Sequence, residues 1–334
     1  MGNILCVRKI DSKPNSLCDQ STETSTMQFS RFPSTVRRRI VENLDYNSRL
    51  NLKRTSHDFK LLVDSVPYIF NRIKYQSPIH RYSEIIQIKI QHDGGYESYI
   101  KSGENRTLVE RSRGVSFSVD QDYQQVVGQR MDSLLARNYV ECLELNLAHD
   151  IDGGLLRLMN MRYLKYVFIE LMVDDPQQQS TQQTESLRQL LSRLPCGLYG
   201  FRCYFVSYLR HPPLPFFDFL KHVRDSLEIH NIRVSDANLL ELTAEKCEVG
   251  SPDITLNGVF EFIKARMLSM KRTSFRMNLP KVANFSEEDT ITGMGLMFRV
   301  EKLDGYYFLH LDNCTMVTQL TSIAHNCIIG EIID

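Results

Sequence analysis

The 334-residue chain contains no tryptophan, and no apolar run in it approaches the ~20 residues that a membrane-spanning helix needs. It has no excess charge of either sign, because 40 Lys and Arg residues balance 40 Asp and Glu residues. A neutral chain gives no support for binding nucleic acid through its phosphates, which requires clustered cations. Apolar residues make up 42% and charged residues 24%, which excludes a wholly disordered, collagen-like or coiled-coil protein.

Cysteine is sparse and irregularly spaced. The eight cysteines form no CxxC pair, and they are too few for a disulfide scaffold in a chain of this length. The first ten residues also lack the long apolar segment of a secretory signal peptide. We therefore expect reduced thiols and a cytoplasmic and/or nuclear location.

The motifs of common catalytic and cofactor sites are missing. The chain has neither of the glycine-rich loops GxxxxGK[ST] and GxGxxG that cradle phosphate, no GxSxG nucleophile elbow and no HExxH metal motif. His310, Cys314 and Cys327 are too few for a structural zinc site, which takes four closely spaced ligands. We therefore predict a protein that is not an enzyme and has no cofactor or metal.

The N-terminus allows two interpretations. Gly2 would be available for myristoylation after removal of Met1, and Cys6 would then accept palmitate as a second membrane anchor. The pattern, however, has Ser or Thr where this chain has Cys6. Residues 11–28 are rich in Ser, Thr, Gln and Asp and contain almost nothing apolar. We therefore favour a plain disordered tail over residues 1–28, without membrane attachment.

The next segment, residues 29–75, has the pattern of three short helices. Pro33 suits the first turn of a helix, and apolar residues then recur every fourth position at Val36, Ile40 and Leu44. Asp45 or Asn47 can cap a second helix, and Thr55 or Ser56 can cap a third. So small a block with apolar faces predicts that a partner or the next domain completes part of its surface.

The rest of the chain alternates strand and helix patterns. Residues 140–147 and 164–171 share an LxxLxL spacing at an interval of 24 residues, and 198–205 is a looser copy. Shorter alternating pieces follow at 227–229 and 275–279. A period in the twenties with such strands indicates degenerate leucine-rich repeats, in which helices connect parallel strands. One face of the sheet would then be an extended surface suited to binding another protein.

Helices are expected between these strands at 155–159, 187–194, 216–223 and 259–270. Near the C-terminus, two alternating segments at 296–302 and 306–311 flank Asp304-Gly305. An Asp-Gly pair between two such segments is a strong signal for a β-hairpin with a tight turn. We expect this hairpin to cap the last repeat.

The helical block resembles the F-box. The positions that fall in the family's pattern without a gap are Phe32, Pro33, Val36, Ile40, Leu44, Leu50, Leu52, Phe59 and Leu62. Phe32 and Phe59 replace a leucine and a tryptophan but keep their bulk. Arg49 stands where a leucine is frequent, and Thr55 where the family has valine. The resemblance implies that the nine matching residues bind a Skp-type linker, which joins a cullin and a RING protein into an SCF ubiquitin ligase.

The segment 227–270 is similar to the type-two F-box-associated domain of nematode-type F-box proteins. The similarity is carried by a short strand and by a helix with the sequence Phe260-Glu261-Phe262-Ile263-Lys264, although the family's tryptophan after that lysine is absent. This resemblance implies that the C-terminal domain presents a protein substrate to the ligase.

Together these patterns predict a fold between α+β and α/β. A three-helix F-box over 29–75 precedes a degenerate leucine-rich-repeat-like domain over 76–334, which ends in a C-terminal β-hairpin cap. The predicted function is that of a substrate-recognition adaptor of an SCF-type cullin ubiquitin ligase. The alternative is a non-ligase leucine-rich interaction scaffold, tethered to a membrane if Gly2 and Cys6 are acylated. The fold of residues 76–139 is left open.

Overall fold

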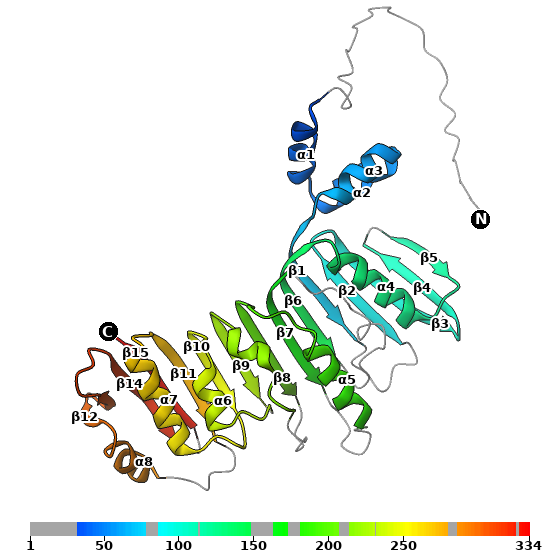
Figure 1. Ribbon diagram of the computed structural model, residues 1–334. Helices are drawn as coiled ribbons and strands as arrows, with labels where there is room; N and C mark the ends of the chain where they lie inside the picture. The colour runs from blue at the N-terminus through cyan, green and yellow to red at the C-terminus, as the bar shows by residue number, and fades with distance from the viewer. Residues whose placement is uncertain are drawn as a thin grey trace, which may run out of the picture.

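In the computed structural model, a long, curved sheet has three helices beside the start of its first strand and further helices on one face (Figure 1). The structure describes residues 32–77, 86–112, 114–147, 163–172, 181–206, 214–230, 232–279, 286–324 and 327–334. The predicted tail with Gly2 and Cys6, and the helix expected at 155–159, lie outside these residues. None of the helices in the described part of the chain is long and apolar enough to cross a membrane.

The three N-terminal helices form where the sequence predicts them. They are α1 (Ser34–Glu42), α2 (Tyr46–Thr55) and α3 (His57–Ser65). Pro33 precedes the first turn of α1. The N-caps of α2 and α3 are Asp45 and Ser56, whose side chains accept the backbone N–H groups three residues ahead at 2.9 and 3.2 Å. Local sequence chemistry therefore fixes where each helix begins.

All described strands belong to one 15-stranded sheet. Its centre is seven parallel strands that follow chain order: β1 (Ile69–Gln76), β6 (Tyr139–Leu147), β7 (Leu164–Met172), β8 (Gly200–Val206), β9 (Ser226–His230), β10 (Lys246–Gly250) and β11 (Thr273–Asn278). Residues 69–75, which the sequence pattern grouped with the helical block, form β1 because Phe70, Ile73 and Tyr75 are fully buried in the sheet core. The assignment of these strands to leucine-rich repeats stays a prediction.

Residues 76–139, whose fold the sequence left open, hold an antiparallel extension of the sheet. From β1 the order continues through β2 (Gln87–His92), β3 (Gly95–Gly103), β4 (Arg106–Arg111) and β5 (Val115–Val119). Helix α4 (Tyr123–Leu135) then packs on β3 and β4 before the chain enters β6. Val127 and Met131 of α4 are buried in the same core as Tyr99 and Val109 of the strands.

One face of the sheet is covered by helices. Helices α4, α5 (Thr181–Leu191), α6 (Asp236–Glu241) and α7 (Leu256–Leu268) lie on the same side (Figure 1), and the short 3₁₀ helix η3 (Asp218–His222) precedes β9. The apolar positions of the predicted repeats form the core beneath them. Nine of these side chains are at most 2% exposed: Val140, Leu143, Leu145, Leu147, Val167, Ile169, Leu198, Phe201 and Cys203. The LxxLxL spacing therefore marks core positions, as expected.

The C-terminal segment contains α8 (Glu287–Met294), β12 (Arg299–Leu303), β13 (Tyr306–His310), β14 (Val317–Ala324) and β15 (Cys327–Ile333). The hairpin at Asp304-Gly305 is confirmed: both residues have positive φ, 50° and 85°, as a type I′ turn requires. Strands β14 and β15, which the sequence pattern did not predict, lie between this hairpin and β11, and β15 pairs with β11. Contrary to the expectation from the sequence, the hairpin therefore does not cap the last parallel strand but forms the outer edge of the sheet.

Candidate interaction surfaces

The face of the sheet opposite the helices carries polar side chains in rows. Because neighbouring parallel strands are in register, opposed residues form a line across the sheet. From β1 to β15 the central row contains Lys74, Glu144, Phe168, Arg202, Glu228, Glu248, Arg276 and Ile329. These residues alternate with core residues along each strand, so their side chains lie on the open face.

The charges on this open face are mostly paired with one another. The ion pairs are Arg72–Glu144, Arg202–Glu228 and Arg276–Glu248, the last with 3.7 Å between Nε and Oε1. Cationic and acidic side chains are therefore both present along the row, and the face is not a patch of one sign. Such a surface selects a ligand by geometry and hydrogen bonding more than by long-range attraction.

Two shallow depressions on the open face share Phe168, Arg202 and Glu228, and together they form one groove. One depression extends toward β1 and the other toward β15. The guanidinium carbon of Arg202 lies 5.5 Å from the centre of the Phe168 ring, and the Tyr204 and His230 rings are 4.8 Å apart. The groove is thus lined by flat rings and charged groups, which suit contacts with an extended polypeptide.

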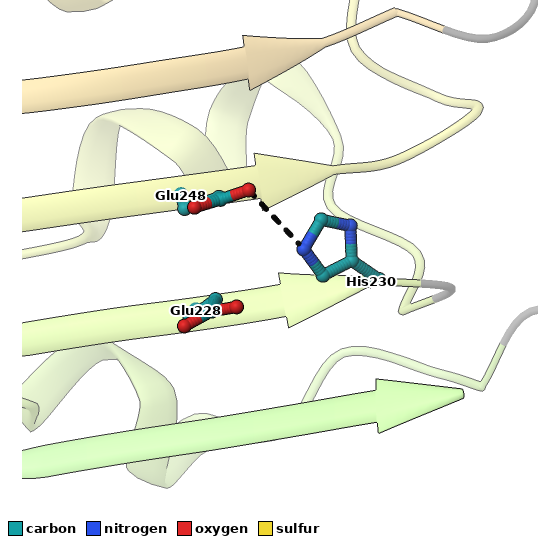
Figure 2. Close-up of side chains that lie close together, drawn as sticks. All are labelled: Glu228, His230 and Glu248. Carbon is teal, nitrogen blue, oxygen red and sulfur yellow. Dashed lines mark ion pairs between the residues drawn. The ribbon is translucent and has the colours of Figure 1, made fainter. Parts of the chain in front are cut away.

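Figure 2 shows Glu228, His230 and Glu248 on β9 and β10, whose ligand atoms all lie within 4.8 Å of one another. In the described part of the chain no other group of three His, Cys, Asp or Glu side chains converges in this way. His230 Nε2 is 3.5 Å from Glu248 Oε1, and burial lowers the pKa of His230. Arg202 and Arg276 already contact the two carboxylates and would repel a cation. The cluster therefore favours hydrogen bonding to a ligand over metal binding.

The thiols offer no nucleophile at this groove. Burial raises the pKa of Cys203 to about 12 and that of Cys247 to about 11, so both stay protonated near neutral pH. The described cysteines are all free thiols. His310, Cys314 and Cys327 do not converge on a common point among the described residues.

A second surface, the tyrosine edge, follows the N-terminal ends of β6, β7 and β8. Tyr139, Tyr163 and Tyr199 are 45%, 48% and 43% exposed. The first two rings are 4.5 Å apart, and Lys165 Nζ and the Arg224 guanidinium lie 5.4 and 5.7 Å from the Tyr199 ring. Tyrosine and arginine are enriched at protein interfaces, so this edge is a candidate contact surface.

Of the nine residues predicted to bind a linker, six lie on α1–α3, Phe32 and Pro33 lie directly before α1, and Leu44 lies between α1 and α2; none of them is buried. Pro33 and Val36 are exposed. The other seven side chains are half-buried: Phe32, Ile40, Leu44, Leu50, Leu52, Phe59 and Leu62. Between residues 34 and 65 only Val41 and Arg49 are buried. The helices therefore leave each of these apolar side chains at least partly exposed, as a block completed by a partner does.

Arg49 has a role that sequence comparison missed. It is 5% exposed, and its guanidinium donates hydrogen bonds of 3.0 to 3.2 Å to the backbone carbonyls of Glu42, Leu44, Val66 and Pro67. These bonds join α1 and α2 to the segment that leads into β1. Because the accepting residues are 5 to 18 positions away, no local pattern indicates the contacts.

Tyr46, at the start of α2, anchors the helices on the sheet. Its ring lies 5.0 Å from both Phe70 and His92, and its hydroxyl accepts a hydrogen bond from Arg130 at 3.3 Å. Arg130 also donates to the buried carboxylate of Glu97 at 2.6 and 3.0 Å. Burial opposes ionisation of Glu97, but the charge and hydrogen bonds of Arg130 outweigh it and hold the pKa of Glu97 below its usual range. A buried ionic network therefore supports the contact.

The F-box domain model matches residues 29–71, the stretch that holds α1, α2 and α3. No curated protein and no solved structure matches the chain. F-box domains bind Skp-type linkers in SCF complexes, and F-box proteins are typically non-catalytic substrate-recognition subunits of SCF ubiquitin ligases. The match, together with the three helices that its residues form, supports the identification of this chain as an F-box protein.

Proposed function

We propose that this chain is the substrate-recognition adaptor of an SCF-type cullin ubiquitin ligase, acting in the cytoplasm and/or nucleus. The observation that carries the proposal is the F-box match over three helices, together with the partial or full exposure of all nine predicted linker-binding side chains. Exposed apolar surface of this kind favours binding of a partner, because association removes that surface from water.

In this proposal α1, α2 and α3 bind the Skp-type linker and, through it, the cullin. Pro33 at the N-cap of α1 and Val36 in its first turn are exposed, and the half-buried Ile40 follows Val36 on the same face one turn later. Anchors in such interfaces are commonly a few well-buried side chains that dominate the binding energy. We expect these residues to be among them.

The remaining domain would hold the protein substrate. The groove on the open face and the tyrosine edge are the two surfaces that offer aromatic and charged groups at fixed spacing. The resemblance of 227–270 to a nematode-type F-box-associated domain supports this assignment. Such a role requires no catalytic group, because the adaptor itself forms no covalent bond with the substrate or with ubiquitin. It raises the effective concentration of a substrate lysine near the charged ubiquitin-conjugating enzyme.

The first test concerns the linker-binding surface. Val36 is 40% exposed, so Val36→Asp should leave the fold intact but place an unpaired carboxylate in an apolar interface. We expect co-purification with the Skp-type linker and cullin to fall at least tenfold. The matched control is Leu240→Asp on α6, where the side chain is 45% exposed and distant from the F-box in the fold. That variant should bind the linker like the unmodified chain.

Two results would count against the proposal. Undiminished linker binding by a folded Val36→Asp variant would remove α1 from the interface. Failure of the unmodified chain to bind the linker at all would favour the alternative, a non-ligase interaction scaffold that uses the same groove and tyrosine edge.

A further inference from the structure

The sheet has one unprotected edge. Strand β5 lies at its end beside β4, and no other described strand pairs with its outer side (Figure 1). In an edge strand, every second residue directs its backbone N–H and C=O groups outward. These unpaired groups are a template for another strand. Four of its five residues are exposed, including Val115 at 54% and Phe117 at 39%.

The residues of β5 do nothing to discourage such pairing. The strand has the sequence Val-Ser-Phe-Ser-Val and contains no charge, proline or glycine. At the opposite edge of the sheet, β12 carries Arg299, Glu301 and Lys302 within five residues. Charged side chains, and lysine above all, are what proteins commonly place on an edge strand to prevent association. The contrast sets β5 apart as the edge open to a partner.

The sequence of β5 is a palindrome centred on Phe117. In an antiparallel pair about a two-fold axis at that residue, Phe117 faces itself, Ser116 faces Ser118, and Val115 faces Val119. We propose that β5 pairs in this register with β5 of a second copy of the chain, which joins two sheets edge to edge. The inference does not depend on the proposed ligase function. A two-fold contact is self-complementary by construction, and here every pair joins identical residue types.

The surroundings of β5 are compatible with this pair. Phe117 is opposite the buried Val109, so its ring continues the helix-covered face beyond α4, with Arg111 stacked at 5.0 Å on one side. A second Phe117 would supply a cross-strand aromatic partner. Asp120, 95% exposed by its side chain, would face Gly114, so no like charges meet. A five-residue strand buries much less than the ~1,200 Å² of a standard interface, so the dimer is weak and concentration-dependent.

Register-specific cross-linking tests the pair. Ser116→Cys and Ser118→Cys are near-isosteric changes at exposed positions that leave Phe117 in place. A disulfide needs Cα atoms about 4.4–6.8 Å apart, which directly opposed residues satisfy and diagonal neighbours do not. We therefore expect oxidation to cross-link a mixture of the two variants, whereas either variant alone and the unmodified chain, with its native cysteines, should stay uncross-linked at that site.

Sedimentation over a concentration series that reaches the high micromolar range provides the second measurement. The unmodified chain should show a monomer–dimer equilibrium, and Phe117→Lys should weaken it at least tenfold. Leu303→Lys makes a comparable change on β12, where the side chain is 55% exposed, and should have no effect. Self-cross-linking of either cysteine variant would overturn the register. A monomer at all concentrations would overturn the pairing, and leave β5 to a strand of another protein or to a segment of this chain.

Discussion

The guanidinium of Arg49 acts as a structural tie between the F-box helices and the sheet. A buried cation is tolerated only where its donors are satisfied, and here all three nitrogens donate to backbone carbonyls. Hydrogen bonds with a charged donor are stronger than neutral ones. A leucine, frequent at this position in the F-box, would pack there but leave carbonyls from Glu42 and Val66 without this donor.

We therefore predict that Arg49→Leu lowers the free energy of unfolding of the helical block by about 2 kcal/mol, the cost of leaving buried carbonyls without a donor. Amide hydrogen exchange over residues 34–65 would measure the change. The control is Arg54→Leu in the last turn of α2, where the side chain is exposed and the effect should be within ~0.5 kcal/mol. Equal protection in the two variants would show that packing alone holds α1 and α2 on the segment before β1.

For single residues, the sequence predicts the contacts that join neighbours along the chain. Asp45 and Ser56 are recognisable as N-caps because the groups they bind are three residues away. The contact of Arg130 with Tyr46 spans 84 residues, and its contact with Glu97 spans 33. Nothing in the local pattern around Tyr46 indicates such partners, because they come together only when the sheet forms.

Among the elements, the C-terminal hairpin follows most directly from its residues. Gly305 has a φ of 85°, a region that β-branched residues avoid. Gly305→Val should therefore lower the free energy of unfolding by about 1 kcal/mol or more. Thermal unfolding would detect the loss as a lower melting temperature. Gly305→Asn is the matched control, because asparagine tolerates positive φ, and it should lie close to the unmodified chain. Equal melting temperatures for all three would mean that the turn contributes nothing to stability.

Strands differ in how well the sequence predicts them. The parallel strands β6, β7 and β8 follow from the LxxLxL spacing because the apolar residues at those positions pack in one core. The sequence pattern did not predict the antiparallel strands β2 to β5, β14 and β15. Strand β5 alternates apolar and polar residues, but four of its five residues are exposed, and its segment alone does not indicate that it pairs with β4. Pairing between strands is a non-local interaction, so a pattern of one segment underdetermines it.

For the whole molecule, the relation between the two functional surfaces is fixed by the contact of α2 with the sheet. Besides the Tyr46 contacts, Asn47 donates a hydrogen bond to the backbone carbonyl of Gly94 at 3.0 Å. The F-box helices lead directly into β1, and the groove crosses the sheet from β1 toward β15. A linker on the helices and a substrate in the groove would therefore be held at a defined separation.

We predict that Tyr46→Ala loosens this arrangement without abolishing linker binding, because it removes the ring contacts with Phe70 and His92 and the acceptor of Arg130. Spin labels at Arg54→Cys on α2 and Leu240→Cys on α6, in a background with the other accessible cysteines replaced, would report the distance distribution between helices and sheet. It should be narrow in the parent protein and clearly broader with Tyr46→Ala.

Tyr163→Ala is the matched control, because it removes a tyrosine of the exposed edge that makes no described contact with the helices. Its distance distribution should stay narrow. A rigid adaptor keeps a bound substrate lysine at a constant effective concentration beside the conjugating enzyme, whereas a loose one spreads the lysine over a larger volume. Tyr46→Ala should therefore retain the linker and lose ubiquitin transfer. A distribution as narrow as that of the parent would instead assign the fixed orientation to Arg49 and the short connection into β1.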